Sequence, residues 1–278
     1  MDTQQPYSGK TFGLEIIAIL VGLLFLVPFY FVIVNSLKTF AELLTDPTSL
    51  PTALQWNNFS RAWNIMKFPT VLKNSILVTV ISNLGIALIS AMAAYRIVRK
   101  PTRLNNLLFA LFVAAMVIPF QSIMIPLVKV AKSLGLFNSI WGLVVCYLGF
   151  GGPMSIFLFH GFIKSIPMEI EESARVDGTS AYGTFFRIVL PLLQPIAVTV
   201  ILLNCLWIWN DFLLPFLVLQ SPELKTIPLA TNSFFGQYTK QWDLALAALL
   251  LGVTPIIVFF LIMQRHIIEG ITAGSVKG

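Results

Sequence analysis

The chain has 278 residues, of which 57% are hydrophobic and only 11% are charged, and its formal net charge is +6. Soluble globular domains carry about 25% charged residues, so this composition excludes an ordinary soluble domain. The positive charge does not indicate nucleic-acid binding, because the basic residues are scattered or flank apolar segments, where they suit contact with anionic lipid headgroups.

Six apolar segments are long enough to cross a bilayer, which takes about 20 helical residues each. Membrane strands would require a closed barrel of alternating polarity, and the sequence shows no such alternation. We therefore predict an all-α integral membrane protein that forms a single domain over residues 1–278, with both termini on one side. The expected spans are 14–37, 71–95, 105–128, 138–163, 191–219 and 244–264.

The first span is expected to remain as a membrane anchor. It is longer than the core of a cleavable signal, which has about 7–15 residues, and Pro28-Phe29-Tyr30-Phe31 follows where a cleavage site needs small residues. The loop after it, about 38–70, is expected outside the membrane on the extracytoplasmic side. Its Trp56 and Trp63 suit the interfacial belt of a bilayer.

The orientation follows from the link between the second and third spans, which holds Arg96, Arg99, Lys100 and Arg103 and no acidic residue. Cytoplasmic loops are enriched in Lys and Arg, so we expect this link in the cytoplasm. Both termini and the segment 164–190 then lie on the cytoplasmic side as well.

Two spans contain residues that disturb helices. The third is expected to be interrupted at Pro119 and again at Pro126, and the fourth contains Gly149-Phe150-Gly151-Gly152-Pro153. Such breaks free backbone groups that need partners in neighbouring helices or in a lined cavity. Structural kinks and a solute path explain them about equally well.

The segment 164–190 cannot lie in lipid, because six charged residues fall between Glu169 and Arg187. At roughly 3 kcal/mol for each charge, inserting them would cost about 18 kcal/mol. A Leu or Phe recovers only about 0.5 kcal/mol. The segment is therefore predicted to project into water.

Within this segment the sequence predicts two short helices joined by a turn. The first is expected over about 167–177, with a proline at its first position and acidic residues in its first turn. Gly178 is expected to end it in the left-handed conformation. Thr179 or Ser180 can cap the second helix, which must stop or bend at Pro191.

The fifth span holds the polar candidates within the membrane. Asn204, Trp207 and Asn210 recur at i, i+3 and i+6 along one helical side, where an aromatic face beside amides suits a sugar in a translocation path. A helix interface rich in aromatic residues has the same pattern. Asp211 is a candidate for H⁺ or Na⁺ coupling, although one acid in the middle of six spans is thin support for it. The alternative is that Asn210 and Asp211 pair with a neighbouring helix or with backbone.

The sequence contains no motif that indicates catalysis, nucleotide binding or metal binding by this chain. Gly9-Lys10-Thr11 imitates the end of a phosphate-binding loop, but Gln4 stands where the upstream glycine is required. Two histidines make a metal or catalytic cluster hard to build. We expect a protein that is not an enzyme, has no ATPase site and binds no metal or cofactor itself.

One motif is specific. Glu172-Ser173-Ala174-Arg175-Val176-Asp177-Gly178, followed by Ile188, Leu190 and Pro191, resembles the EAA loop of binding-protein-dependent ABC importers. That pattern is Glu-Ala-Ala, two variable residues, a frequent Asp, Gly, nine variable residues and Ile-x-Leu-Pro. Only Ser173 departs from it, by a small-for-small change.

The resemblance covers most of the chain. Within this family, the chain is similar to the carbohydrate-uptake branch of the permeases. The further matching segments are Asn35-Ser36-Leu37-Lys38, Asn74-Ser75, Trp209-Asn210-Asp211-Phe212, Gln264-Arg265 and the tail from Glu269 to Gly278. The EAA loop is specific to the importer superfamily, whereas the tail, which ends in Lys277-Gly278, narrows the resemblance to the sugar branch.

The resemblance implies six transmembrane helices with a cytoplasmic coupling helix in the EAA loop. It implies a permease subunit of a sugar importer in the inner or plasma membrane of a bacterium. The partners would be a second related permease, two ATP-binding subunits that hold ATP and Mg, and an extracytoplasmic solute-binding protein.

The resemblance also implies roles for single residues. Glu172 would make a polar contact with the ATPase, Asp177 and Gly178 would shape the turn, and Ala174 would permit close approach. The outside loop at about 221–243 would touch the binding protein. The tail residues expected to reach the ATPases are Gly270, Thr272, Gly274 and Lys277.

Three alternatives stay open. An importer of the same superfamily for another solute, such as glycerol phosphate, has the same sequence features. An ion-coupled secondary carrier would depend on the proton gradient instead of ATP. A membrane-embedded enzyme is the third, although the catalytic groups are missing.

Overall fold

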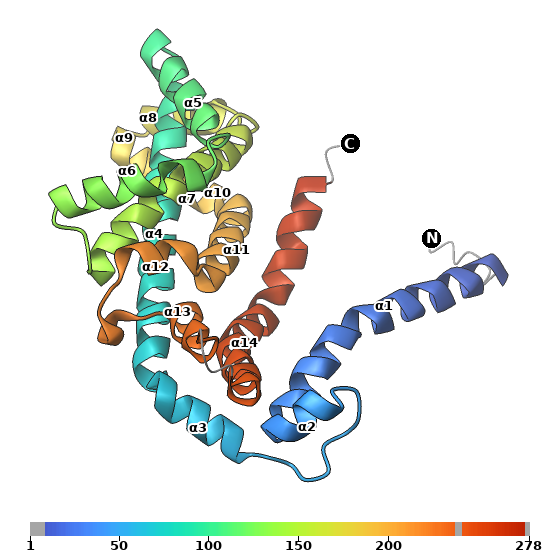
Figure 1. The fold of residues 1–278 in the computed structure, drawn as a ribbon. Coiled ribbons are helices and arrows are strands. Elements are labelled where there is room, and N and C mark those ends of the chain that lie inside the picture. Colours follow the sequence, from blue (N-terminus) through green and yellow to red (C-terminus); the bar gives the residue numbers. More distant parts are fainter. Residues whose placement is uncertain (1–8, 237–240, 276–278) are drawn as a thin grey trace. The chain divides into compact units, whose positions relative to one another are not determined.

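A computed structural model of the chain describes residues 9–236 and 241–275, with side chains described as far as Gln264 apart from that of Lys10. The elements over these ranges are all helices (Figure 1), which confirms the predicted all-α membrane fold. Four helices are long and apolar enough to cross a membrane. Two pairs of helices pass the same test together but are bent, so the described residues give six spans if each bent pair is one span.

The chain divides into two compact units. Unit 1 consists of Met1–Phe68 with Thr231–Val253, and unit 2 consists of Pro69–Ala230 with Thr254–Gly278. Helix α14 (Trp242–Ser275) contributes residues to both units. The other elements of unit 1 are α1 (Gly9–Ser36), α2 (Phe40–Thr45), α3 (Asn57–Met66) and the 3₁₀ turn η3 (Asn232–Phe234).

Unit 1 is held together by polar contacts at the end of its long helix. The buried Asn58 side chain of α3 donates hydrogen bonds to the carbonyl oxygens of Ser36 (3.0 Å) and Lys38 (2.8 Å). Lys38 is itself fully buried, and its Nζ donates to the carbonyl of Asp46 at 2.8 Å. Ser36 and Lys38 belong to one of the segments that carry the family resemblance, and here that segment anchors the following loop.

Unit 2 is built on the long helix α4, which runs from Phe68 to Arg99. Small and polar residues along one side of α4 are buried, among them Ser82, Ser90 and Ala94, and such residues let membrane helices approach closely. The other helices of unit 2 are α5 (Arg103–Ala115), α6 (Phe120–Ser133), α7 (Ile140–Ile163), α8 (Glu169–Val176), α9 (Ala181–Thr184), α10 (Leu190–Leu192), α11 (Gln194–Asn210), α12 (Leu213–Val218) and α13 (Ile227–Thr231), with a π-helical turn η1 (Phe185–Val189) and a 3₁₀ turn η2 (Pro222–Leu224).

The third expected span, 105–128, is broken in the structure. Helices α5 and α6 meet at an angle of 110°, and Pro119, the residue before α6, has an extended backbone (φ −62°, ψ 133°). A proline cannot donate to the preceding turn, so the helix ends before it. The second expected interruption is absent, because Pro126 lies inside α6.

The glycine-rich stretch of the fourth span does not interrupt its helix, since α7 runs through it with Pro153 inside. Gly151 instead permits close packing. A Cβ atom at this position would lie 2.5 Å from Cδ1 of Ile86 on α4 and 2.8 Å from Oδ1 of Asn204 on α11. The glycine is therefore a point where three helices meet, rather than a break.

The fifth expected span, 191–219, ends earlier than the hydrophobicity predicts. Helix α11 stops at Asn210, and Asp211 is extended (φ −72°, ψ 125°) before α12 begins. Asp211 Oδ1 accepts a hydrogen bond from the backbone N–H of Leu213 at 3.0 Å. A carboxylate that bonds local backbone in this way competes with a continuous helix.

Two asparagines hold the loop that follows α12. Asn138 Oδ1 accepts hydrogen bonds from the backbone N–H groups of Gln220 and Ser221, both at 2.9 Å. Asn74, near the start of α4, donates to the carbonyl of Glu223 at 2.8 Å. Asn74 is one of the residues that carry the family resemblance, and here it fastens this loop to α4.

Candidate functional site

The segment 164–190, which was predicted to project into water, contains a helical hairpin. Helix α8 ends at Val176, Gly178 has φ +82°, and the Ser180 hydroxyl accepts from the N–H of Gly183 to cap α9. The left-handed glycine and the cap are both confirmed. The first helix begins at Glu169, two residues later than expected, so the proline before it lies outside the helix.

The second arm of the hairpin carries the rest of the motif. After α9 the backbone widens into the π-helical turn η1, and it then continues through α10 to a bend of 74° before α11. Ile188 and Leu190 are half-buried, and Leu190 packs against the core of unit 2. Pro191 is exposed and lies two residues before the bend, whose corner is the buried Leu193.

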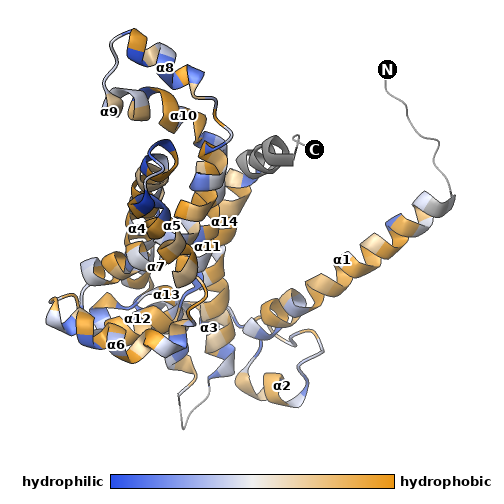
Figure 2. Ribbon diagram, turned by 90° about the horizontal axis from the view of Figure 1, so that it is seen from above, coloured by the Kyte–Doolittle hydropathy of each residue, from blue (hydrophilic) through white to orange (hydrophobic). Residues whose placement is uncertain are grey.

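Helix α8 has an inner and an outer face. Glu171 and Ala174 are buried, whereas Glu172, Ser173 and Asp177 are exposed. Figure 2 shows hydrophilic residues on α8, in contrast to the hydrophobic α1. The candidate coupling residue Glu172 is thus accessible to a partner, and Ala174 packs against its own chain.

The inner face is tied to the end of α4 by a buried charge cluster. Glu171 is fully buried, and its Oε1 accepts from Nε of Arg99 at 2.7 Å. Its Oε2 accepts from the Tyr95 hydroxyl at 2.7 Å and lies 3.7 Å from Nη2 of Arg175. Arg99 Nη2 also donates to the carbonyl of Ile166 at 3.0 Å. We call Tyr95, Arg99, Glu171 and Arg175 the Arg99 cluster.

Sequence reasoning did not find this cluster. It treated Arg99 only as a topology signal and Glu171 only as an acid in a helix first turn, and the two residues are 72 positions apart. One signal was available, because Tyr95 and Arg99 are four residues apart and therefore share a face of α4. The pairing itself depends on how α8 folds back.

The three candidates for the translocation path do not share one environment. Asn204 is buried, and its Nδ2 donates to the Ser155 hydroxyl of α7 at 3.0 Å and to the carbonyl of Val200 at 2.9 Å. Trp207 and Asn210 are exposed. Asn204 therefore joins two helices, and the two exposed residues are available to a solute or to another subunit.

Asp211 is held by its neighbours. Its Oδ2 accepts from the hydroxyl of Tyr147 on α7 at 2.9 Å, and the Tyr147 ring packs edge-on against Trp207 with 5.4 Å between ring centroids. Pairing with a neighbouring helix and with local backbone, one of the two interpretations left open above, describes this geometry.

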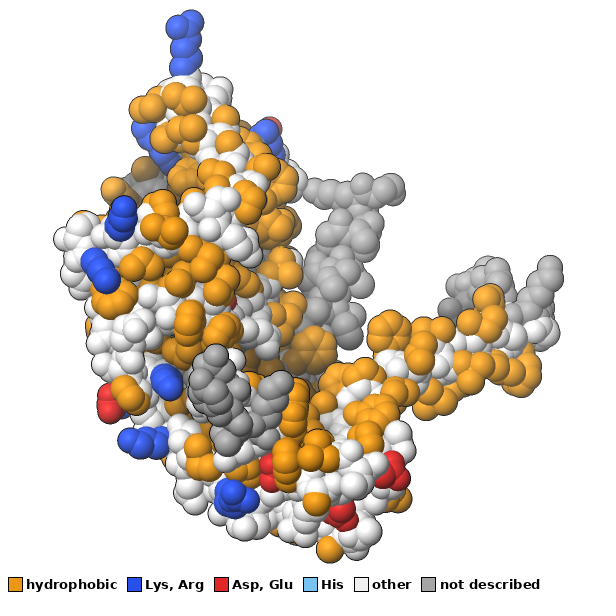
Figure 3. Space-filling model, in the orientation of Figure 1, with side chains coloured by type: hydrophobic (Ala, Val, Ile, Leu, Met, Phe, Trp, Pro, Cys, Tyr) orange, Lys and Arg blue, Asp and Glu red, His pale blue; other side chains and the backbone are white. Residues whose placement is uncertain are grey.

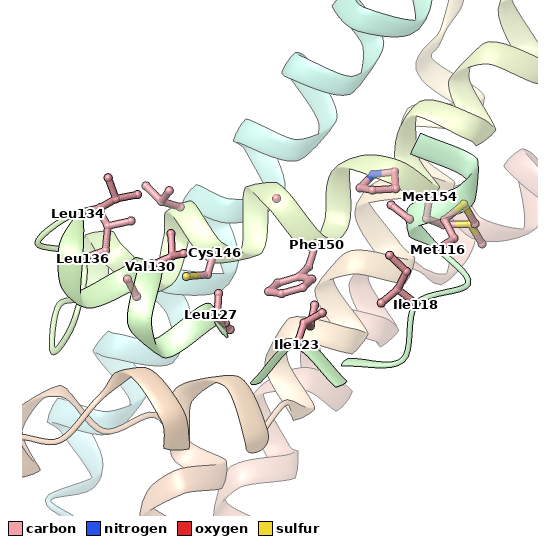
Figure 4. A pocket seen from close by; sticks show the side chains of 15 residues that line it. Met116, Ile118, Ile123, Leu127, Val130, Leu134, Leu136, Cys146, Phe150 and Met154 are labelled. Carbon is pink, nitrogen blue, oxygen red and sulfur yellow. The ribbon is translucent and has the colours of Figure 1, made fainter. Parts of the chain in front are cut away.

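An apolar cavity of about 610 Å³ opens beside the break between α5 and α6 (Figure 4). Leu127, Val130, Cys146 and Phe150 are among its lining residues. Such a lining provides no side-chain hydrogen bonds of the kind a sugar needs. Hydrophobic side chains also cover much of the molecular face in Figure 3, as expected of a surface that meets lipid tails or other membrane subunits.

The expected ATPase-contacting tail is not described in side-chain detail. Lys277 lies outside the described residues, and so do the side chains at positions 265–275. Among the side chains that the structure does describe, no group of three or more His, Cys, Asp or Glu lies close enough to hold a metal ion.

Comparisons with known proteins agree on one family. Residues 83–273 match the family described as binding-protein-dependent transport system inner membrane component. The chain is 41% identical over 266 residues to the probable starch degradation products transport system permease protein AmyC of Thermoanaerobacterium thermosulfurigenes, covering 95% of this chain and 96% of that protein. It is 33% identical over 275 residues to the melibiose/raffinose/stachyose import permease protein MelC of Bacillus subtilis, covering 98% and 99%.

The fold has a solved counterpart. A chain in the crystal structure of a bacterial ABC transporter involved in the import of the acidic polysaccharide alginate superposes with a TM-score of 0.78. The identity is 19%, and the match covers 94% of this chain and 99% of the other. This likeness shows the fold. The family match over residues 83–273, with the relative that is 41% identical, shows that the chain belongs to the family of binding-protein-dependent transport system inner membrane components.

Proposed function

We propose that this chain is the permease subunit of an ATP-driven importer of sugars or oligosaccharides, in which it forms half of the translocation path. Family membership supports the permease role. The relatives named for starch degradation products and for melibiose, raffinose and stachyose support a carbohydrate substrate. Trp207 and Asn210 are the exposed residues that we assign to the path, and Asn204 supports them from between the helices.

The two-faced geometry of α8 is the observation that carries the coupling role. Its 8 residues form a rod of about 12 Å at 1.5 Å per residue, compact enough for a groove on another protein. The outer face presents Glu172 and Asp177, and the inner face is anchored through Glu171. Closure of an ATPase pair would displace α8 and switch the permease between its inward-facing and outward-facing states.

The complete transporter would contain a second related permease, two ATP-binding subunits that hold ATP and Mg, and an extracytoplasmic solute-binding protein. We place α8 and both termini in the cytoplasm of a bacterial cell, because the basic residues at the end of α4 and the start of α5 favour that side. The tail with Gly270, Thr272, Gly274 and Lys277 would reach the ATPases.

Reconstitution of the complex in proteoliposomes tests this function. We expect uptake of a sugar that requires ATP and the binding protein and that survives collapse of the proton gradient. The purified subunit alone is expected to hydrolyse no ATP. Uptake that is lost with the proton gradient but persists without ATP would establish an ion-coupled carrier instead. A binding protein that binds only non-sugar solutes would refute the assignment of a sugar as the substrate.

The variant Gly178→Asp tests the coupling role of the hairpin. Its φ of +82° strains any residue with a Cβ atom, and a second carboxylate would stand beside Asp177. We expect normal membrane insertion with a large loss of sugar-stimulated ATPase activity. Gly161→Ala is the control, because this glycine of α7 has open space around it. Stimulation at the control level in Gly178→Asp would contradict the coupling role.

A further inference from the structure

Both arms of the hairpin are attached to the last turns of α4. The first arm is held by Glu171, which accepts hydrogen bonds from Arg99 and Tyr95 at 2.7 Å each. The second arm is held by Phe185, the first residue of the π-helical turn, whose ring lies 5.2 Å from the Tyr95 ring between centroids. Tyr95 therefore contacts both arms at once.

The apolar core continues this attachment. Ala91, Ala94 and Ile97 of α4 lie in one buried cluster with Phe185 and Val189 of the second arm. The same cluster includes Ile166, Leu193 and Val200. A displacement of the hairpin must consequently either carry the end of α4 with it or break a buried apolar contact.

Besides the short link through residues 164–168 to α7, two routes lead from α8 into the membrane helices. The covalent route runs through a left-handed glycine, a π-helical turn and a bend of 74° before it enters α11. The lateral route is a direct charged contact between Glu171 and Arg99, reinforced by the bond from Arg99 to the Ile166 carbonyl just before the hairpin. The lateral route contains no turn or bend, so it is the stiffer of the two.

We propose that Tyr95, Arg99 and Glu171 are positioning residues that make α8 and the cytoplasmic end of α4 move as one body when the ATPase displaces α8. This inference rests on the proposed function. A buried ion pair adds little stability over apolar packing of the same volume, but its short hydrogen bonds fix one geometry. That geometry defines where α8 sits when a partner presses on it.

The first test measures the motion in the native complex. The substitutions Lys100→Cys and Glu169→Cys introduce two sites for spin labels, because both positions are exposed. The native thiols of Cys146 and Cys205 are buried and therefore react less readily with the label. Pulsed EPR compares the label spacing in nucleotide-free and ATP-trapped complexes. We expect one unchanged spacing in both states. A spacing that changes between them would overturn the proposal, whatever the variants below do.

The second test separates positioning from stability. In Glu171→Gln we expect assembly and basal ATP hydrolysis to persist while sugar transported per ATP falls about tenfold, within the usual range of coupling effects. The matched control is Glu169→Gln, an exposed acid of the same helix. Equal transport per ATP in the two variants would refute the role of Glu171.

If the Glu171→Gln complex does not assemble, the variant Tyr95→Phe tests the positioning role instead. It removes one hydroxyl and leaves the ion pair between Arg99 and Glu171 in place. We expect a smaller loss of transport per ATP and a label spacing that now differs between the two nucleotide states. A spacing as constant as in the native complex would contradict the proposal. If the native complex traps ATP but shows no ATP-driven uptake, the proposed function fails, whereas the EPR comparison can still be made and tests the motion separately.

Discussion

Two of the polar clusters in the described part of unit 2 differ in chemistry. The Arg99 cluster, at the end of α4, is charged and includes the fully buried Glu171. The second, which we call the Asn204 cluster, joins α7 to α11 through the neutral side chains of Ser155 and Asn204, 3.0 Å apart. Gly151 lies beside it and permits the close approach.

The difference follows from where each cluster lies along its helices. A charge in the middle of a membrane span costs roughly 3 kcal/mol or more, so helices pair there through amides and hydroxyls. At a helix end, beside a hairpin rich in charged residues, a buried carboxylate such as Glu171 has a cation within reach. The charged cluster fastens a projecting element, and the neutral one fastens two spans.

Arg99→Ala is expected to have the largest effect on this comparison. It removes the cation that lies 2.7 Å from the buried Glu171 carboxylate and leaves only the half-exposed Arg175 at 3.7 Å. The expected loss of stability is toward the lower end of the about 3–5 kcal/mol seen when one partner of a buried pair is removed. The midpoint of detergent denaturation of the purified protein measures this loss. Arg96→Ala, at an exposed position three residues earlier, should change stability by less than about 0.5 kcal/mol. Equal midpoints for the two variants would show that the charged cluster is not a tight attachment.

Gly151→Ala tests the close approach beside the Asn204 cluster. Its new Cβ would overlap Ile86 and Asn204, which are both buried and have little room to move, so we expect a loss of about 1–3 kcal/mol. The neighbouring Gly152 has no atom within 4 Å of an added Cβ. Gly152→Ala should therefore be neutral or stabilising, by up to about 1 kcal/mol from helix propensity. A stabilising Gly151→Ala would be inconsistent with tight packing there.

The smallest effect is expected for the hydrogen bond between Ser155 and Asn204. A double-mutant cycle with alanine at both positions should give a coupling of about 0.6 kcal/mol, the average for such bonds between membrane helices. Ser165→Ala, at an exposed position, should combine additively with Ser155→Ala. A coupling as large as the stability loss expected for Arg99→Ala would remove the distinction between the two clusters.

Local features of the hairpin were predictable from sequence. Gly178 and Ser180 act through backbone conformation and a side-chain cap, and both depend on residues only a few positions apart. The role of Gly151 within a continuous α7 was not predictable, because it depends on the close approach of Ile86 and Asn204 from two other helices. The end of α11 was missed for a similar reason, since Asp211 meets Tyr147 from another helix.

The amino-acid sequence by itself determined that this is a helical membrane protein, and it predicted a charged hairpin outside the lipid, because hydrophobic length and charge cost act segment by segment. It also carried the motif by which the family is identified. Only the tertiary structure decided what Arg99 and Glu171 do, since residues 72 positions apart acquire a shared role through the contact alone. The same holds for Asn204, whose burial depends on two neighbouring helices and not on its own.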